Sequence, residues 1–442
     1  MKLLFENLGA IKKADLDLSK KLIIFCGPNG TGKTYVNYAV YGYLRQLYVG
    51  VPLFKLNELF DMQKKEITLD YDTLFNLKGV YGNLKKEAIN RVFGIKDSSF
   101  FNNFKSKSTI NRETFRTTIH KEKFEYNYEF SGVSVLYTKK ENSDTISVQL
   151  KNQVSLDTIN ETVETFHLAQ LSKYLCNRTI VNSYILPVER NSVYTFKDEL
   201  AVNRLTSKGK LDNRGLENRY PLPIIDALIT ATDLNTIKKS NSDYYYLAEE
   251  IETDILNGKI SVSEDGGVQF IPDKAPEITL PVHLFASIIK NISGLIIYLK
   301  YQAKKNDLLI IDEPELGLHP DNQILLARIF ARLINSGIRL LISTHSDYII
   351  KELNNLIMLS SDKKEIKAKA QELNYRDKEK INPNEVGAYL FNYNTDDNRH
   401  VDVISLPVDE SGFEIKTIDE AIKNLNEASE ELFYSLKYSD ND

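Results

Sequence analysis

The alternation of hydrophobic and polar positions divides the chain into a strand-rich start, a mixed middle and a final third in which helices and strands alternate. Short apolar runs predict strands at 3–5, 10–18 and 22–26. Apolar positions recur at helical spacing over 35–47, which predicts a helix directly after the third strand. The continuous apolar runs at 308–311 and 339–342 are typical of parallel strands covered on both faces. We therefore expect an α/β fold with a mixed sheet flanked by helices.

The middle of the chain contains both kinds of pattern. Helix-like segments are expected within 53–104, including 84–92, and at 156–175, 224–234 and 244–256. Strand-like runs are expected at 114–120, 124–130, 133–137, 145–150 and 183–187. The turn Asp265-Gly266-Gly267 predicts a hairpin that joins 260–263 to 268–271.

The chain closes with a pattern typical of an amphipathic helix. Thr417 and Glu420 have the spacing of a capping box. The apolar positions that share one face are Ile418, Ile422, Leu425, Leu432 and Leu436.

Composition narrows the class of protein. The chain has 442 residues, a formal net charge of −5 and 42% hydrophobic residues, which is typical of a packed globular protein rather than one that coats nucleic acid with its whole surface. Cys26 and Cys176 are too few for a disulfide scaffold, and the six histidines show no zinc-ligand spacing. No apolar segment is long enough to cross a membrane, and Glu6 stands where a signal peptide would continue apolar, so we expect a cytoplasmic protein without a membrane partner.

The strand at 22–26 runs into a glycine-rich segment with the spacing of a phosphate-binding loop. Gly27-Pro28-Asn29-Gly30-Thr31-Gly32-Lys33-Thr34 fits G-x-x-x-x-G-K-[ST] at every fixed position, between a predicted strand and a predicted helix. Glycines allow successive backbone N–H groups to point at phosphate oxygens, and the helix adds its positive end. We expect Asn29, Gly30, Thr31, Gly32, Lys33 and Thr34 to bind the nucleotide, with Lys33 on the β- and γ-phosphates and Thr34 on Mg²⁺. The alternative is a glycine turn beside an exposed lysine.

A second pair of acids follows the buried strand at 308–311. Ligands in open α/β sheets bind at the carboxyl ends of strands, so Asp312 is expected to hold the Mg²⁺ shell and Glu313 to polarise the attacking water. Alone, the two acids could simply end a strand in a solvated loop; beside a phosphate loop they indicate hydrolysis of ATP or GTP. The next strand ends at His345, which is placed to contact the γ-phosphate, although a lone histidine is more often structural.

In this order the motifs resemble those of the AAA-15 group of ABC-type P-loop ATPases, which includes the overcoming-lysogenization-defect proteins and is related to the heads of SMC, RecN and RecF. The resemblance is carried by 27–34, by Ile310-Ile311-Asp312-Glu313-Pro314-Glu315, by Leu316-Gly317-Leu318-His319-Pro320 and by Ser343-Thr344-His345-Ser346. Pro187-Val188-Glu189-Arg190 also resembles a motif of that group, and the roles of Glu189 and Arg190 stay open. The resemblance implies ATP rather than GTP, and a homodimer or larger homo-oligomer.

Heads of this kind bind ATP between the phosphate loop of one subunit and a signature segment of the other. The resemblance places that segment at 285–290, with Ser287 contacting nucleotide in trans. The segment departs from the usual Leu-Ser-Gly-Gly pattern, and Lys290 is equally consistent with an ordinary helix start.

The resemblance and the patterns together divide the chain into six segments. They are an N-terminal ATPase lobe with the phosphate loop (1–50), a helical insertion (51–112), an antiparallel β part of the head with a following helix (113–190), a helical insertion or arm (191–258), a C-terminal ATPase lobe (259–416) and a C-terminal helix and tail (417–442).

These features are compatible with three functions to different degrees. Too few residues follow His345 for the Toprim nuclease that some members of the group carry, so we expect a sensor or regulatory ATPase of bacterial antiphage defence that controls a separate effector, a nuclease or a toxin. The alternative is a DNA-maintenance ATPase of RecF or SMC type, which makes nucleic acid a further candidate partner. A transporter cassette fits less well, because the signature is degenerate and the insertions are large.

Overall fold

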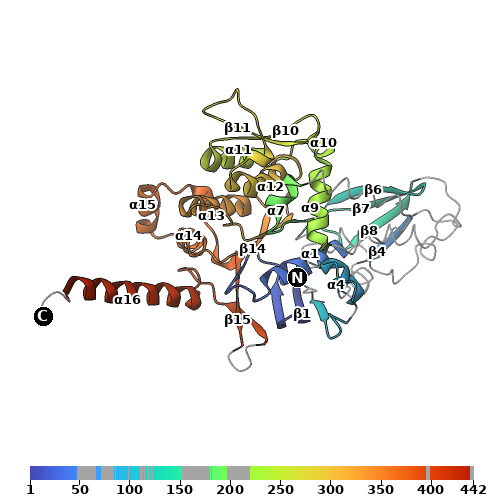
Figure 1. The fold of residues 1–442 in the computed structure, drawn as a ribbon. Coiled ribbons are helices and arrows are strands. Elements are labelled where there is room, and N and C mark those ends of the chain that lie inside the picture. Colours follow the sequence, from blue (N-terminus) through green and yellow to red (C-terminus); the bar gives the residue numbers. More distant parts are fainter. Residues whose placement is uncertain are drawn as a thin grey trace.

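The computed structural model describes residues 1–46, 66–70, 84, 86–97, 99–109, 113, 116, 120, 123–151, 180, 182–196, 220–394 and 399–438. Within them, a nine-stranded mixed sheet lies between helices, as the apolar pattern predicts (Figure 1). Its strand order is β5-β1-β2-β16-β15-β3-β14-β13-β9. The strands are β1 (Lys2–Leu8), β2 (Ile11–Asp17), β3 (Leu22–Cys26), β5 (Lys105–Thr109), β9 (Ser183–Leu186), β13 (Leu308–Asp312), β14 (Arg339–Ser343), β15 (Val386–Tyr393) and β16 (Val401–Leu406).

The apolar runs of β3 and β13 lie in the parallel part of this sheet, together with β9, β14 and β15. β9, β13, β14, β3 and β15 pair in parallel, so that Ile310 lies opposite Leu341 and Ile342 opposite Ile24. Because side chains alternate along a strand, each run contributes to two cores, one on each face of the sheet. This arrangement brings the carboxyl ends of β3, β13 and β14 to one edge.

Helices cover both faces of the sheet, and Figure 1 shows α11, α12 and α13 on one side with α1 and α4 on the other. The helices are α1 (Lys33–Gln46), α4 (Lys86–Phe93), α7 (Arg190–Thr195), α9 (Leu222–Thr232), α10 (Leu234–Ile237), α11 (Tyr245–Ile251), α12 (Ser287–Tyr301), α13 (Pro320–Asn335), α14 (Asp347–Met358), α15 (Lys364–Glu372) and α16 (Lys416–Tyr438). Short turns of other helix types are η2 (Glu252–Leu256), η3 (Val282–Leu284), η4 (Asp377–Glu379) and η5 (Pro383–Glu385).

Two smaller sheets accompany the central one. β10 (Gly258–Val262), β11 (Val268–Pro272) and β12 (Leu280–Pro281) form a three-stranded sheet, which confirms the expected hairpin. β4 (Glu66–Asp70), β8 (Thr145–Leu150), β7 (Val133–Lys139) and β6 (Phe124–Phe130) form a four-stranded antiparallel sheet. Of the helix-like segments expected within 53–104, the one at 84–92 is present as α4, but residues 66–70 form β4, where apolar and polar residues alternate with the period of a strand.

Several predicted elements fall on residues that the structure does not describe. They are the helix at 156–175 and most of the strand at 114–120, whose described residues Arg116 and His120 are helical, so that prediction is wrong at these two positions.

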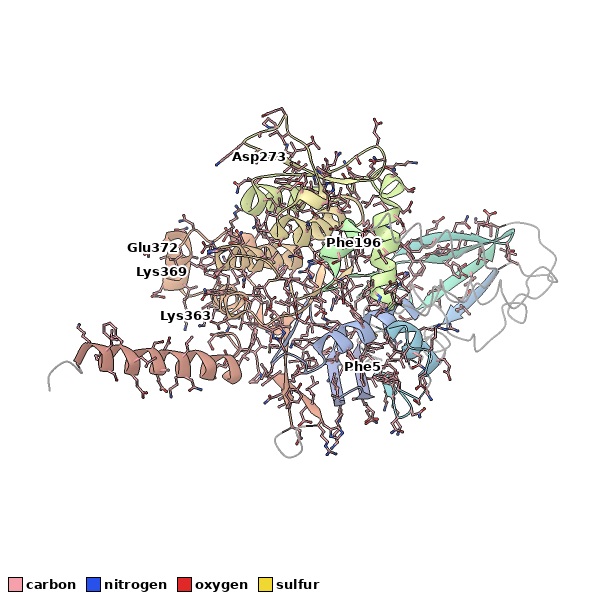
Figure 2. The ribbon with its side chains drawn as sticks, in the orientation of Figure 1. Phe5, Phe196, Asp273, Lys363, Lys369 and Glu372 are labelled. Carbon is pink, nitrogen blue, oxygen red and sulfur yellow. The ribbon has the colours of Figure 1, made fainter. Side chains whose placement is uncertain are left out.

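Side chains in the central part of the protein are buried, whereas those of α15 and α16 are largely exposed. The side chain of Phe5 is fully buried, whereas Lys369 and Glu372 form an exposed ion pair on α15 (Figure 2). The predicted final helix is present as α16, which extends away from the body (Figure 1). Its apolar residues Leu425, Leu432 and Leu436 are 67%, 73% and 81% exposed. None of the described helices is long and apolar enough to cross a bilayer.

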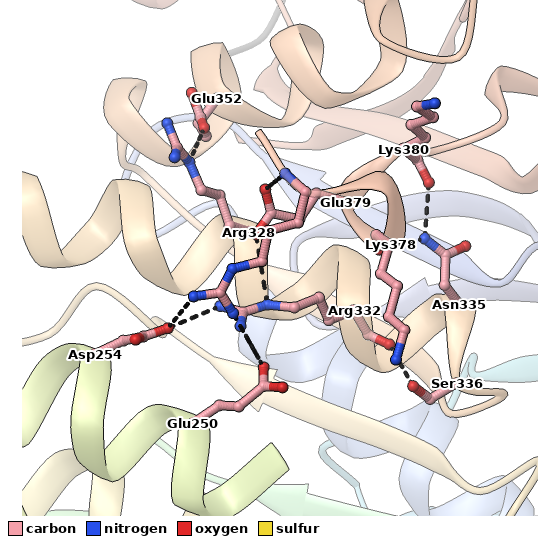
Figure 3. Close-up of polar contacts among 11 residues, drawn as sticks. Glu250, Asp254, Arg328, Arg332, Asn335, Ser336, Glu352, Lys378, Glu379 and Lys380 are labelled. Atoms are coloured by element: carbon pink, nitrogen blue, oxygen red, sulfur yellow. Dashed lines mark hydrogen bonds and ion pairs between the residues drawn. The ribbon is translucent and has the colours of Figure 1, made fainter. Parts of the chain in front are cut away.

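A network of ion pairs joins α13 to α11, η2 and η4 (Figure 3). Arg332 is buried and pairs with Glu250, with Asp254 at 3.4 Å and with Glu379 at 3.7 Å. Its neighbour one turn earlier, Arg328, donates to Glu352 at 2.6 Å. Because a buried guanidinium needs compensating carboxylates, these contacts fix the helical layer over the sheet.

Candidate functional site

The phosphate loop connects the end of β3 to the start of α1. Gly27 has a φ of 128°, and a Cβ there would lie 2.0 Å from the carbonyl oxygen of Phe391, so only glycine fits. Gly32 has a φ of 87°, which turns the chain directly into helix α1. Thr31 is fully buried and its hydroxyl donates to Pro28 O at 2.8 Å, so this side chain stabilises the loop rather than facing the cavity.

Lys33 is largely buried at the centre of this loop. Its ammonium donates to Gly27 O at 2.9 Å and to Pro28 O at 2.8 Å. Burial lowers the pKa of Lys33 to about 8, and the nearby carboxylates Asp312 and Glu313 oppose that shift. Lys33 and the two acids line the same cavity, so its positive charge lies close to theirs.

Asp312 ends β13 and is held in place by three side chains. Thr34 Oγ1 donates to Asp312 Oδ2 at 2.7 Å, and Asn37 Nδ2 donates to Asp312 Oδ1 at 3.1 Å. Ser343, at the end of β14, donates its hydroxyl to the same Oδ1 and accepts from Asn37 at 2.8 Å. The predicted Mg²⁺ residues Thr34 and Asp312 are thus in direct contact.

The pairing of Thr34 with Asp312 fits a hard divalent cation. Mg²⁺ prefers oxygen ligands and usually takes only one or two protein groups, the remainder being water and phosphate oxygens. Among the described residues, no group of three or more histidines, cysteines and carboxylates could enclose a metal by itself. This donor set suits Mg²⁺ held jointly with a nucleotide.

Glu313 follows Asp312 in a left-handed turn, with a φ of 48°. Its backbone N–H still donates to Ser343 O at 2.9 Å, so the turn begins at the end of the parallel pairing. The carboxyl group is about one-third exposed, at 34%. Burial raises the pKa of Glu313 and the charge of Asp312 adds to that effect, which makes this carboxylate a stronger base.

His345 lies beside Glu313 after the end of β14. Its Nε2 atom is 3.8 Å from Glu313 Oε1, and its backbone N–H donates to Glu315 Oε1 at 2.6 Å. Burial lowers the pKa of His345 to about 4, and the charge of Lys33 contributes to this shift. The imidazole is therefore neutral near pH 7.

Most of the predicted residues line one cavity of about 690 Å³. Its lining includes Asn29, Gly30, Gly32, Lys33, Thr34, Asp312, Glu313 and His345. Two aromatic residues that the sequence did not single out, Tyr35 and Phe100, line the same cavity beside Gly9 and Ala10. Phe100 is 56% exposed, and an exposed ring at a cavity mouth can stack on a planar ligand.

The signature-like segment lies elsewhere on the chain. Ser287 is exposed at the first position of α12, and neither it nor Lys290 is among the cavity-lining residues. Lys290 Nζ instead contacts His283 O at 3.4 Å. The structure therefore separates Ser287 from the phosphate loop of its own chain.

Arg190 and Glu189 lie next to the acids at the end of β13. Arg190 is buried and donates to the carbonyl oxygens of Asp312 at 2.6 Å and Glu313 at 2.7 Å. Glu189 is exposed and accepts from Tyr38 Oη at 3.3 Å. Local sequence leaves the roles of both residues open. Asn37 was missed, although its place one helical turn after Thr34 puts both on the same face of α1.

One family model matches this chain. The AAA_15 model, described as an AAA ATPase domain, matches residues 1–350. None of the curated proteins matches the chain.

Three solved structures are similar to this chain at low sequence identity. An Smc head bound to the C-winged helix domain of ScpA has 11% identity, a TM-score of 0.36 and coverage of 93% of this chain and 98% of that chain. An Smc head with an extended coiled coil, bound to the C-terminal domain of ScpA from Pyrococcus furiosus, has 13% identity, a TM-score of 0.36 and coverage of 97% and 98%. The SMC head domain from Thermotoga maritima has 11% identity, a TM-score of 0.31 and coverage of 92% and 98%.

Proposed function

This chain belongs to the AAA_15 family of AAA ATPase domains, and we propose that it hydrolyses ATP with Mg²⁺ as the regulatory subunit of a bacterial antiphage defence system. The observation that carries the hydrolytic part is the contact between Thr34 of the phosphate loop and Asp312 of β13, with Glu313 in the same cavity. A phosphate-binding loop, two Mg²⁺ ligands and a carboxylate base are the parts that hydrolysis of a nucleoside triphosphate requires.

The phosphate chain binds across the loop and the start of α1. Backbone N–H groups of 29–34 and the positive end of α1 attract the phosphate oxygens, and Lys33 neutralises the β- and γ-phosphates. Thr34 and Asp312 would hold Mg²⁺, which would neutralise charge on the phosphates. Tyr35 and Phe100 offer aromatic surface to the adenine ring at the mouth of the cavity.

Glu313 accepts the proton of the attacking water. Its raised pKa suits a general base, and its position next to Asp312 aims it at the γ-phosphate end of the site. Neutral His345 donates a hydrogen bond to the γ-phosphate or to the water without adding charge.

Ser287 is proposed to complete the site of a second copy. Its exposure at the start of α12, outside its own cavity, supports a contact in trans with nucleotide held by a partner subunit. The positive end of α12 suits an anionic γ-phosphate. ATP would then join two copies of this chain as a dimer.

Control of a separate effector is the second part of the proposal. It is supported by the resemblance of 310–320 and 343–346 to the overcoming-lysogenization-defect group and by the segments outside the ATPase lobes, which offer surface for a partner. Such a subunit holds its effector, a nuclease or a toxin, in one nucleotide state and releases it in another.

Steady-state hydrolysis tests the enzymatic part. The wild-type protein is expected to release phosphate from ATP only with Mg²⁺, and Lys33→Ala should neither bind ATP nor hydrolyse it. A wild-type protein that binds no ATP would overturn the proposal.

Mass photometry tests the regulatory part. The Glu313→Gln protein is measured with and without Mg-ATP after co-expression with the product of its neighbouring open reading frame. An ATP-dependent dimer or larger particle that carries the neighbour supports control of an effector. A particle that keeps its size and recruits nothing contradicts it, and ATP-dependent, salt-sensitive DNA binding would favour the DNA-maintenance alternative.

A further inference from the structure

Arg190 is a buried arginine whose guanidinium contacts backbone carbonyls. It is the first residue of α7, directly after β9, and is 3% exposed. Nη1 donates to Pro187 O at 3.1 Å and to Asp312 O at 2.6 Å, and Nη2 donates to Glu313 O at 2.7 Å. Nε donates to Asn291 O at 3.1 Å. One planar group thus joins four carbonyl oxygens, from the β9–α7 connection, from the end of β13 and the residue after it, and from α12.

Two of these carbonyls define the turn that carries Glu313. Consecutive carbonyls of a strand point in opposite directions, so a single guanidinium reaches both only where the chain leaves the strand. The φ of 48° at Glu313 produces that turn, and a left-handed conformation is unfavourable for a glutamate unless its surroundings hold it. The two bonds from Arg190 provide this restraint.

The contact of Nε reaches α12, the helix that carries Ser287. Nε of Arg190 binds Asn291 O within α12, and Asn291 Nδ2 donates to Leu316 O at 2.7 Å. The segment from Asp312 to Leu316 is therefore connected to α12 at two points.

We propose that Arg190 is a positioning residue. It holds the backbone of Glu313 in its left-handed turn, so that the carboxylate lines the cavity, and it connects this turn to α12. The inference rests on the proposed ATPase activity and assigns a role to the arginine of the Pro187-Val188-Glu189-Arg190 motif. The planar fork of arginine is required, because a lysine keeps the charge but its single nitrogen cannot reach all four carbonyl oxygens that Nε, Nη1 and Nη2 of Arg190 bind.

Arg339 provides a matched control. It is also a buried arginine that donates to backbone carbonyls, those of Leu18 at 2.8 Å and Lys20 at 2.7 Å. It begins β14, whereas the catalytic acids lie at the other end of the parallel strands. Its replacement removes a structural arginine without touching Glu313.

The test compares Arg190→Lys, Arg190→Ala and Arg339→Lys in kcat, KM, ATP affinity and thermal unfolding. Arg190→Lys is expected to lower kcat about 100-fold while ATP affinity stays near the wild-type value, since a displaced base affects the chemical step and leaves the phosphate loop intact. Millimolar guanidinium should restore part of the kcat of Arg190→Ala, and sodium chloride at equal ionic strength should not. Arg339→Lys should lose thermal stability but keep its kcat.

Two results overturn the inference. Arg190→Lys with a wild-type kcat would show that the fork is unnecessary, and a loss of ATP affinity parallel to the loss of kcat would show a structural role only. Should Arg190→Ala fail to fold, Arg190→Lys alone decides. Failure of the proposed function is distinct, because wild-type protein would then bind ATP without turnover, or not bind it, and the role of Arg190 would fall with it.

Discussion

The hydroxyl of Thr34 donates to the carboxylate of Asp312 at 2.7 Å, although 278 positions separate the two residues in the chain. The contact exists because β3 and β13 both flank β14 in parallel, which brings the start of α1 and the end of β13 to one edge. The two residues expected to hold Mg²⁺ are therefore adjacent, and the contact can be tested directly.

Replacing Thr34 should weaken the response to Mg²⁺. Thr34→Ala removes a metal ligand and one of the donors to Asp312, so the Mg²⁺ concentration for half-maximal hydrolysis should rise at least about 10-fold. Thr34→Ser keeps the hydroxyl and should behave like the wild type. A magnesium titration of ATPase activity distinguishes the two, and equal titrations for Thr34→Ala and wild type would remove Thr34 from the metal site.

Glu313→Gln should separate binding from hydrolysis. The amide keeps the size of the side chain but cannot accept a proton, so kcat should fall by about 10²- to 10⁴-fold while ATP affinity is retained. Single-turnover hydrolysis and equilibrium ATP binding measure the two quantities. Lys33→Ala is the control that should lose both, and a Glu313→Gln protein with wild-type turnover would show that another group is the base.

His345 should make the free energy of unfolding decrease at acidic pH. Its pKa is about 4 in the folded protein, below the ordinary value of 6.5, so the unfolded chain binds a proton first as the pH falls. The free energy of unfolding should therefore be unaffected by His345 above pH 6.5 and should decrease from pH 6.5 toward 4. Urea unfolding at pH 7 and pH 5 should show a larger loss for wild type than for His345→Gln.

An independent NMR titration checks the same group. The His345 imidazole signal should move with a midpoint well below 6.5. A midpoint at the ordinary value would place the ring in solvent, away from Lys33.

Arg332 should matter for stability and not for hydrolysis. Arg332→Met leaves the buried Glu379 without its cation, whereas Glu250 and Asp254 keep Arg376 at 3.6 and 3.5 Å, so the free energy of unfolding should fall by about 1–3 kcal/mol. Urea unfolding measures this loss. The exposed ion pair of α15 supplies the control, because Lys369→Met should change the midpoint little.

The elements with a strong local pattern were predictable from the sequence. The runs at 22–26, 308–311 and 339–342 are strands because continuous apolar residues suit a sheet that is covered on both faces. β4 could not be predicted, because its five alternating residues lie in a stretch rich in charged residues and give only a weak strand pattern.

The sequence by itself determined which residues can bind phosphate and Mg²⁺ and which can act as the base. Glycines at fixed spacing before Lys33 and Thr34, and two acids at the end of an apolar run, require only short-range geometry, so they could be recognised without a fold. Their meeting in one cavity followed from the general rule that strand ends share an edge.

The tertiary structure alone decided which residues hold these groups in place. Asn37 reaches Asp312, and Arg190 reaches Glu313, across strands whose order no local pattern contains. It also decided that Leu425, Leu432 and Leu436 of α16 are exposed, because amphipathic spacing shows that a face exists but not what covers it. Local sequence fixes which groups can react, whereas long-range pairing of the sheet fixes the angles at which they meet.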